Sequence, residues 1–359
     1  MNSSFWKNRN VFLTGHSGFK GGWTALWLSN MGANVYGYSL QPSTKPSFFE
    51  ATKLDKQISK STFANILDLK NLVQAMKIAK PSVVIHMAAQ SLVRESYKLP
   101  VDTYMNNVIG TVNVLEASRQ IETIKAIINV TTDKCYENQE RTKPYSENDR
   151  LGGHDPYSSS KACSELVTTS YRKSFLSDLN IYLASVRSGN VIGGGDWAND
   201  RLIPDFFKAL NKNETLRIRS PNAIRPWQHV LEPISGYLML AEKLITEGNK
   251  YSEAWNFGPE ENETKKVSQI AEYLCSKIKG SRFEIENSLQ PHEAQLLKLD
   301  SSKAKTKLAW KNQWNLEITL NKTIEWYQAW RNQEDMKDIS ISQINCYEEQ
   351  MEKVRIRNK

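Results

Sequence analysis

The chain has 359 residues, of which 40% are hydrophobic and 24% are charged, values ordinary for a folded globular protein. Its formal charge is +8, but 47 basic residues are dispersed among 39 acidic ones, without the basic stripe typical of nucleic-acid binding. No apolar run reaches the roughly 20 residues that span a bilayer, and the N-terminus has no apolar signal-peptide core. We therefore expect a cytoplasmic protein without nucleic-acid or membrane partners.

The cysteines, Cys135, Cys163, Cys275 and Cys346, show no CxxC spacing. Pairs with that spacing typically hold zinc, and closely spaced even sets build disulfide frameworks. We therefore expect four free thiols in a reducing compartment and no metal site.

The N-terminal half alternates short apolar segments with longer amphipathic ones. Strands are predicted at 11–14, 34–38, 82–87, 125–131 and 181–187, and helices at 21–31, 69–80, 107–119 and 158–175. Such alternation is typical of βαβ units in a parallel sheet. Further helices are predicted at 232–246, 266–279 and 316–330, whereas the charged residues from 332 onward predict a surface extension or frayed tail.

These patterns predict an α/β fold, a Rossmann-type doubly wound parallel sheet with a smaller, interleaved C-terminal lobe. We expect residues 1–190 to form the dinucleotide-binding domain, with later contributions from about 230–256. The strand–helix rhythm breaks after Val191, so residues 191–330 are expected mainly in the substrate-binding lobe. Residues 331–359 would form a charged C-terminal extension.

The glycines Gly15, Gly18 and Gly21 follow the first predicted strand and open the first predicted helix. A tight turn needs a residue that tolerates positive φ, and backbone without a Cβ can approach a pyrophosphate at the helix N-terminus. This context predicts a dinucleotide site rather than a purely structural turn. The segment 36–40 lacks the acidic residue that usually binds the adenosine ribose, so it does not separate NAD from NADP.

Two further segments bear on the dinucleotide site. Asp68 either hydrogen-bonds the adenine edge or caps the helix that follows it, and the sequence favours neither role. The segment 86–90 ends another strand, and its small residues Ala88 and Ala89 leave room for a cofactor. His86 itself is expected to be a buried polar residue rather than a catalyst.

Tyr157 and Lys161 lie four residues apart, on one face of a predicted helix. A phenol with a pKa near ~10 is a poor base at neutral pH. A nearby ammonium group stabilises the phenolate and lowers that pKa. The tyrosinate can then take the proton from a sugar hydroxyl while hydride leaves for a nicotinamide.

Thr132, Asp133 and Lys134 directly follow a predicted parallel strand, where α/β proteins gather ligand groups. Thr132 can hydrogen-bond a substrate hydroxyl, Asp133 can act as an acid, and Lys134 can act as a base if its pKa is depressed. The alternative is an ordinary loop ion pair. The presence of Tyr157 and Lys161 favours the catalytic interpretation.

Together these motifs resemble the extended short-chain dehydrogenase/reductase family, the NAD-dependent epimerases and dehydratases, over roughly residues 8–330. Longer segments narrow the resemblance to the dehydratases that act on CDP-glucose. These segments are T-G-H-S-G-F-K-G-G-W, T-D-K-C-Y-E-N, G-N-V-I-G-G-G-D-W-A, R-P-W-Q-H-V-L-E-P and H-E-A-Q-L-L-K-L-D. They are rich in Trp, Gly and His, which makes chance agreement implausible.

The resemblance implies a bound NAD that is reduced and reoxidised within one turnover. Tyr157, supported by Lys161, takes the proton when the 4-hydroxyl of the glucosyl unit is oxidised. Water is then eliminated across carbons 5 and 6, with Asp133 protonating the leaving 6-hydroxyl, before hydride returns to carbon 6. Lys134 stands where such enzymes remove the carbon-5 proton, but dTDP-sugar dehydratases carry Glu there. Lys134 therefore either is the base or positions a hydroxyl or phosphate, while Thr132 keeps the hydroxyl of the Ser found in many family members.

The resemblance also implies which residues surround the ligands. The cofactor is expected to contact Gly15, Ser17, Gly18, Phe19, Lys20, Gly21, Asp68, Ala88, Ala89, Gln90, Asn107, Tyr157 and Lys161. The nucleotide sugar, CDP-glucose or a similar one, is expected to contact Asn190, Arg201, Arg219, Arg225, His229 and His292. Guanidinium groups suit this task because they match diphosphate geometry. A homodimer is implied through helices 107–119 and 158–175, with a tetramer as the alternative.

Two other functions remain open. Another enzyme of the family, such as an epimerase, a 4-ketoreductase or a dehydratase of a different nucleotide sugar, would keep the glycine loop, Tyr157 and Lys161. An epimerase or a ketoreductase would not need the Asp133–Lys134 pair. A non-catalytic dinucleotide sensor would need neither Tyr157 nor Lys161, so their presence argues against it.

Overall fold

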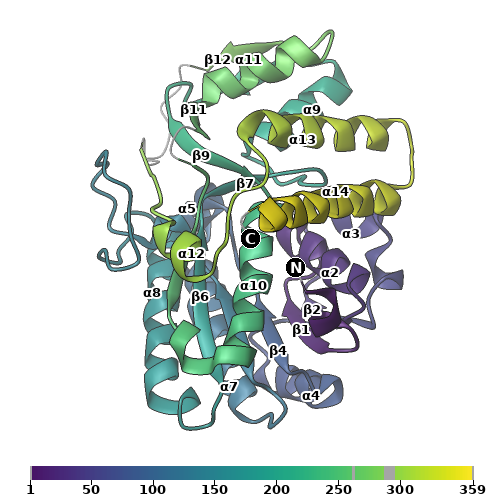
Figure 1. The fold of residues 1–359 in the computed structure, drawn as a ribbon. Coiled ribbons are helices and arrows are strands. Elements are labelled where there is room, and N and C mark those ends of the chain that lie inside the picture. Colours follow the sequence, from purple (N-terminus) through teal and green to yellow (C-terminus); the bar gives the residue numbers. More distant parts are fainter. Residues whose placement is uncertain (1, 261–262, 287–295, 358–359) are drawn as a thin grey trace.

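The computed structural model describes residues 2–260, 263–286 and 296–357. Its centre is a seven-stranded parallel sheet in the order β10-β6-β5-β4-β1-β2-β3, with helices on both faces (Figure 1). The strands are β1 (Asn10–Thr14), β2 (Asn34–Ser39), β3 (Lys60–Phe63), β4 (Val83–His86), β5 (Ala126–Val130), β6 (Tyr182–Ser188) and β10 (Ala254–Phe257). The predicted Rossmann-type fold is confirmed.

The strands separate two hydrophobic cores because alternate residues point to opposite faces of a sheet. Val11 and Leu13 join the core that holds α2 (Phe19–Asn30) and α10 (Leu231–Glu247). Phe12 packs on the other face with α4 (Leu69–Ala79) and α7 (Gly110–Arg119). Because the central strands are buried on both faces, most of their residues are apolar, as in other parallel sheets.

The remaining elements of the N-terminal half are mostly short. They are α1 (Ser3–Trp6), α3 (Phe48–Ala51), α5 (Val93–Lys98), α6 (Pro100–Tyr104) and α8 (Pro156–Tyr171), π-helical turns η2 (Met105–Ile109) and η4 (Arg172–Leu176), and 3₁₀ turns η1 (Leu54–Lys56) and η3 (Asp133–Cys135). The predicted helix 107–119 therefore begins in a π-helical turn, and the predicted helix 158–175 ends in one.

The second half adds a small lobe above the carboxyl edge of the sheet (Figure 1). One small sheet has the order β11-β9-β7, and another pairs β12 with β8. The lobe contains β7 (Asn190–Ile192), α9 (Leu202–Lys212), β8 (Leu216–Ile218), β9 (Ile224–His229), β11 (Thr264–Lys266), α11 (Val267–Lys277), β12 (Phe283–Ile285) and α13 (Leu316–Arg331). The turns of η5 (Gly248–Tyr251) and α12 (Ser302–Lys307) pack beside β6 and β10 of the central sheet. None of these strands was predicted. Four of them, β7, β8, β11 and β12, have only three residues, too few for a measurable periodicity, and the six residues of β9 include Arg225, Pro226 and Gln228 and show no apolar alternation.

The C-terminal segment corrects the prediction of a frayed tail. Residues 336–357 form the 22-residue helix α14 (Met336–Arg357), which lies across α2 in Figure 1. Met336, Ile344 and Tyr347 are buried on its inner face, and Trp27 Nε1 donates a hydrogen bond of 2.8 Å to Glu348. The prediction was wrong because the charged outer face hides the apolar one in the sequence.

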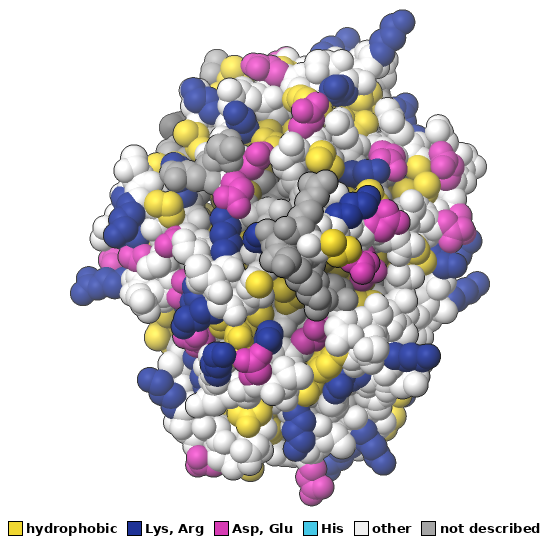
Figure 2. Space-filling model, in the orientation of Figure 1, with side chains coloured by type: hydrophobic (Ala, Val, Ile, Leu, Met, Phe, Trp, Pro, Cys, Tyr) yellow, Lys and Arg dark blue, Asp and Glu magenta, His cyan; other side chains and the backbone are white. Residues whose placement is uncertain are grey.

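The surface agrees with the dispersed charge of the sequence. On the face seen in Figure 2, basic and acidic side chains are interspersed rather than gathered by sign. Within the ranges that the structure describes, no helix is long and apolar enough to cross a membrane.

Candidate functional site

A cavity of about 700 Å³ lies over the carboxyl edge of the central sheet. The parallel register brings Thr14 of β1 beside Tyr38 of β2 and His86 of β4, so the loops that follow these strands open into one space. The small lobe forms the opposite wall, which includes Leu216, Ile218 and Arg219. Ligands of open α/β sheets bind at this edge.

The glycine loop forms one end of the cavity. Gly15 has φ +78°, and a Cβ added at Gly21 would overlap the carbonyl oxygen of Gly15. Gly18 is the N-cap of α2 and offers no side chain to the free N–H groups of the first helical turn. Those N–H groups and the bare backbone fit a dinucleotide pyrophosphate.

Four other predicted cofactor residues also line this wall, namely Ser17, Phe19, Lys20 and Ala89. Lys20 is half-buried, and its Nζ donates to Ser188 Oγ at 3.0 Å. Burial, together with the nearby charges of Arg201 and Lys161, lowers the pKa of Lys20 to about 7.

Of the remaining predicted cofactor residues, the structure places some at the cavity and others away from it. Ala88 and Gln90 line the cavity. Asn107 instead lies behind its wall, where it accepts a hydrogen bond from Gln90 N (2.9 Å) and donates to Ser160 Oγ (2.9 Å). Asp68 is the N-cap of α4 and accepts from Asn71 N at 3.0 Å. It is exposed and absent from the described residues that line the cavity, so the structure favours its capping role.

Tyr157 and Lys161 project from the first turns of α8 into the cavity. Pro156 and a reciprocal capping box between Asp155 and Ser158 start this helix, which fixes where both side chains leave it. Lys161 Nζ donates to the carbonyl oxygen of Val130 at 3.2 Å.

Burial shifts the pKa values of Tyr157 and Lys161 in opposite directions. It raises the pKa of Tyr157 to about 12, although a hydrogen bond with Thr132 opposes the shift. It lowers the pKa of Lys161 to about 8, against the opposing charge of Glu165. In the ligand-free protein at neutral pH, Tyr157 is therefore a neutral phenol beside a protonated lysine.

Thr132, Asp133 and Lys134 turn into the same region at η3. Thr132 Oγ1 donates to Asp133 Oδ1 at 3.0 Å, and Lys134 Nζ lies 3.2 Å from the same oxygen. Lys134 Nζ also donates to Asn190 Oδ1 at 3.3 Å. The second carboxylate oxygen of Asp133 is buried and has no hydrogen-bond partner among the described residues.

The predicted arginines line the lobe side of the cavity, where two of them are paired with carboxylates. Arg201 binds Asp196 at 2.8 Å, and Arg219 binds Asp200 and lies 3.8 Å from Asp205. Burial raises the pKa of Asp205 to about 6. Arg225 and Asn190 line the cavity as well.

The structure places His229, a predicted substrate residue, outside the cavity lining. His229 is buried between the rings of Trp23 and Trp314, and it is absent from the described residues that line the cavity. Burial lowers its pKa to about 3, so it packs as a neutral ring. His292 lies outside the described residues.

Sequence reasoning missed other residues of the cavity wall, among them Asn65, Arg94 and Ser188. Asn65 follows β3, which was not predicted because its four residues include no buried position. Arg94 Nη1 lies 3.9 Å from Asp200, so a second arginine shares that carboxylate with Arg219. Arg94 lies four residues after the segment 86–90, and this position was the signal by which the sequence could have indicated it.

The glycine loop, the Tyr157–Lys161 pair and the parallel sheet define the class of extended short-chain dehydrogenases/reductases. The family model described as GDP-mannose 4,6 dehydratase matches residues 12–323. The chain is 47% identical over 353 residues to a CDP-glucose 4,6-dehydratase of Salmonella typhimurium, covering 97% of this chain and 98% of that protein. The chain belongs to the GDP-mannose 4,6 dehydratase family.

Solved structures share the fold. A dTDP-glucose 4,6-dehydratase of Bacillus anthracis in complex with NAD matches with a TM-score of 0.73 and 22% identity, over 89% of this chain and 96% of that one. A UDP-glucose 4-epimerase of Stenotrophomonas maltophila with bound NAD and formylated UDP-arabinopyranose matches with a TM-score of 0.78 and 19% identity, over 90% and 99%.

Proposed function

We propose that this protein dehydrates CDP-glucose to CDP-4-keto-6-deoxyglucose with NAD as its resident cofactor. The observation that carries the proposal is the 47% identity to a CDP-glucose 4,6-dehydratase over nearly the whole of both chains. The cavity supports it, because Tyr157, Lys161, Thr132 and Lys134 all line one space of a size typical for ligand sites.

The glycine loop and the small residues opposite it would hold NAD. Gly15, Gly18 and the first turn of α2 suit its pyrophosphate, while Ala88 and Ala89 leave space beside the strand ends. Bound NAD supplies the acceptor for the hydride from carbon 4 of the sugar and its donor to carbon 6. We propose residues 1–190, with 230–256, as the NAD-binding domain and 191–330 as the main substrate lobe.

Tyr157 is the proposed base at the sugar 4-hydroxyl. Its Oη is hydrogen-bonded with Thr132, and the Lys161 ammonium lies one helical turn away on the same face. The high pKa of Tyr157 in the ligand-free protein must fall before the phenol can take a proton. A positive charge brought into the cavity with the cofactor would lower it.

Asp133 and Lys134 are the proposed acid and base of water elimination. Moving one proton from Lys134 Nζ to Asp133 Oδ1, across their 3.2 Å contact, turns the ion pair into an amine and a carboxylic acid. Lys134 then takes the proton from carbon 5 while Asp133 gives its proton to the departing 6-hydroxyl. The step restores the ion pair.

On the lobe side, Arg201, Arg219 and Arg225 are proposed to bind the diphosphate. Arg201 and Arg219 already form ion pairs with carboxylates. Phosphate oxygens of the substrate would replace some of these carboxylate contacts. Planar guanidinium groups bind phosphate oxygens in pairs, which gives both affinity and orientation.

We also propose a homodimer in the reducing cytoplasm. Apolar side chains are exposed on α6 and α8, including Val101 (71%) and Leu166 (60%), and these helices pack side by side. We propose that these side chains form the dimer interface, because contiguous exposed apolar surface is typical of protein–protein contacts. Free thiols at all four cysteines fit a reducing compartment.

The deciding experiment incubates the purified protein and NAD with CDP-glucose, dTDP-glucose, UDP-glucose and GDP-mannose in parallel. We expect a product lighter by one water from CDP-glucose alone, seen by mass spectrometry. Water loss from another donor instead would contradict the assignment of the base. No mass change with any donor would contradict the dehydratase, and a comparison of epimeric products with Tyr157→Phe would then separate an epimerase from a sensor.

A further inference from the structure

A buried carboxylate follows the proposed catalytic pair on the same helix. Glu165 lies one turn after Lys161 and two turns after Tyr157, on the face of α8 turned toward the sheet. All three side chains are buried. Neither the proposed reaction nor the sequence analysis uses Glu165, and it does not line the cavity.

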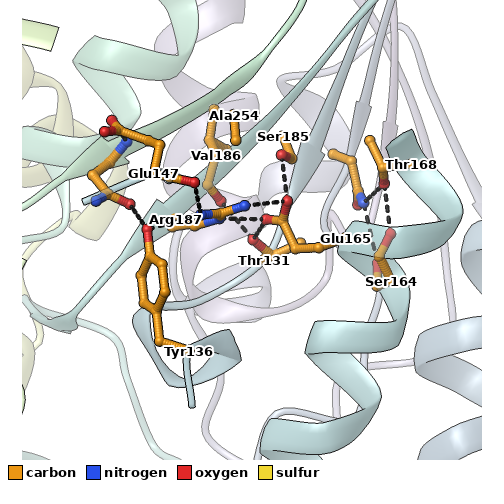
Figure 3. A network of polar contacts seen from close by, with 12 residues as sticks. Thr131, Tyr136, Glu147, Ser164, Glu165, Thr168, Ser185, Val186, Arg187 and Ala254 are labelled. Atoms are coloured by element: carbon orange, nitrogen blue, oxygen red, sulfur yellow. Dashed lines mark hydrogen bonds and ion pairs between the residues drawn. The ribbon is translucent and has the colours of Figure 1, made fainter. Parts of the chain in front are cut away.

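Four hydrogen bonds fix this carboxylate (Figure 3). One oxygen accepts from Thr131 Oγ1 at 2.5 Å and from Arg187 Nε at 2.9 Å. The other accepts from Ser185 Oγ at 2.6 Å and from Arg187 Nη2 at 2.8 Å. Glu165 thus ties α8 to the end of β5 and to β6, with the two-point geometry that makes Arg–carboxylate pairs directional.

The Glu165–Arg187 pair also holds both ends of the turn Thr132–Lys134, which carries the proposed acid and base. Thr131, bound to Glu165, immediately precedes Thr132–Lys134, while Tyr136, just after that turn, receives a hydrogen bond of 2.8 Å from Arg187 Nη1. Tyr136 then donates to Asn256 Oδ1 of β10 at 2.7 Å. Both ends of the turn are therefore held by one buried ion pair.

The same pair sets the charge near Lys161. Burial lowers the pKa of Lys161, whereas Glu165 of α8 and Cys135 of η3 raise it. The charge of Lys161 in turn helps to lower the pKa values of Lys20 of α2 and His86 of β4. If Glu165 lost its charge, Arg187 would be left as an uncompensated buried cation, which is strongly unfavourable.

We propose that Glu165, oriented by Arg187, is a positioning residue that holds the Thr132–Lys134 turn in register with Tyr157 and Lys161 and keeps Lys161 protonated. The proposal rests on the proposed dehydratase function. It makes two separable statements. The positioning statement is that the length of the Glu165 side chain sets the distance from α8 to Thr131, and the charge statement is that its negative charge keeps Lys161 protonated.

Two substitutions separate these statements. Glu165→Asp keeps the charge but is one methylene too short to keep all four contacts, so it should slow water elimination about tenfold or more relative to carbon-4 oxidation. Glu165→Gln keeps the shape but loses the charge, so it should move the alkaline limb of the kcat/KM profile about 1 pH unit lower. The double variant Glu165→Gln/Arg187→Gln removes the uncompensated cation and should return that limb toward its original pH.

Glu232→Gln is the matched control, because Glu232 is also a buried, fully hydrogen-bonded carboxylate but contacts Trp314 and Tyr347 instead. It should change thermal stability without moving the pH profile. A second measurement does not need turnover: the titration of Lys161, followed by NMR of ¹³Cε-labelled lysine and assigned with Lys161→Arg. Its pKa should fall by about 1 unit in Glu165→Gln.

The outcomes are distinct. If the wild-type protein fails to dehydrate CDP-glucose, the proposed function is wrong, and the Lys161 titration still tests the charge statement. An unchanged Lys161 pKa in Glu165→Gln would overturn that statement. Unchanged elimination and oxidation rates in Glu165→Asp would overturn the positioning statement. If Glu165→Gln does not fold, the Glu165→Asp rates still test the positioning statement, and the pH profile of the double variant compared with that of Arg187→Gln alone tests the charge statement.

Discussion

At the residue scale, the glycine loop shows how closely two backbone segments must approach to form the site. A Cβ at Gly21 would overlap the carbonyl oxygen of Gly15, whereas a Cβ at Gly18 would lie 3.4 Å from that same atom. The two positions therefore differ sharply in what they tolerate, although both belong to one motif.

We expect Gly21→Ala to lower the stability of the cofactor-free protein by about 1–3 kcal/mol, because the turn must open to admit the methyl group. Gly18→Ala makes an ordinary contact and should leave the melting temperature nearly unchanged. Thermal unfolding without added NAD measures both. Equal melting temperatures for the two variants would contradict the described geometry.

Tyr157 is expected to act only in the proton transfer. Tyr157→Phe should lower turnover of CDP-glucose by about 10²–10⁴-fold, the usual contribution of a positioned acid or base. NAD binding, measured by calorimetry, should change little, because the glycine loop and α2 carry most of the proposed contacts. A loss of binding as large as the loss of turnover would assign Tyr157 to the cofactor site instead.

The proposed proton transfer from Lys134 to Asp133 gives a sharper test. In Asp133→Asn the amide cannot take the proton from Lys134 Nζ, so the lysine stays charged and cannot act as a base. We expect both water loss and solvent-deuterium exchange at carbon 5 to cease, while reduced nicotinamide still accumulates with CDP-glucose. Continued exchange at carbon 5 would mean that Lys134 works independently of Asp133.

At the element scale, a buried carboxylate of α10 connects α14 to the rest of the fold. Glu232 accepts hydrogen bonds from Trp314 N (2.8 Å) and from Tyr347 Oη of α14 (2.7 Å). Burial raises the pKa of Glu232 to about 7. The folded protein therefore binds this proton more tightly than the unfolded chain, and the stability that it contributes is lost as the pH rises through about 7.

We therefore expect the wild-type protein to lose about 1–3 kcal/mol of stability relative to Glu232→Gln between pH 5 and pH 8. The comparison with the variant is needed because burial lowers the pKa of His16 to about 4 and of His86 to about 3. Those groups destabilise the fold as the pH falls, but they are common to both proteins. Denaturant unfolding at several pH values measures the difference, and parallel curves would contradict the inferred protonation of Glu232.

At the scale of the whole molecule, the exposed apolar side chains of α6 and α8 predict the assembly. Val101→Asp/Leu166→Asp places charges in that patch and should convert a dimer into a monomer, measured by light scattering during size exclusion. Ile78→Asp is the control, because Ile78 on α4 is 52% exposed but lies apart from the patch. If the double variant is still a dimer, the interface lies elsewhere on the surface.

Much of the molecule was predictable from local patterns. Short apolar segments alternating with amphipathic ones predicted the five central strands β2, β1, β4, β5 and β6 of the sheet. The spacing of Gly15, Gly18 and Gly21 predicted the cavity wall, and the four-residue step from Tyr157 to Lys161 predicted the pair that faces it. These features are readable because each depends on neighbours within about one or two turns of the same element. The short strands β7–β9 and the helix α14 were not predicted, since their formation depends on partners far away in the chain.

Tertiary packing decided the rest of the site. Asp68 and His229 have side chains suited to ligands, but one caps a helix and the other is enclosed by tryptophan rings. Conversely, nothing near Glu165 of α8 in the sequence marks its partner Arg187, which comes from strand β6. The sequence by itself determined the chemistry available at the edge of the sheet. Only folding decided which side chains meet there, because burial and long-range contacts set where each carboxylate, amine and ring can lie.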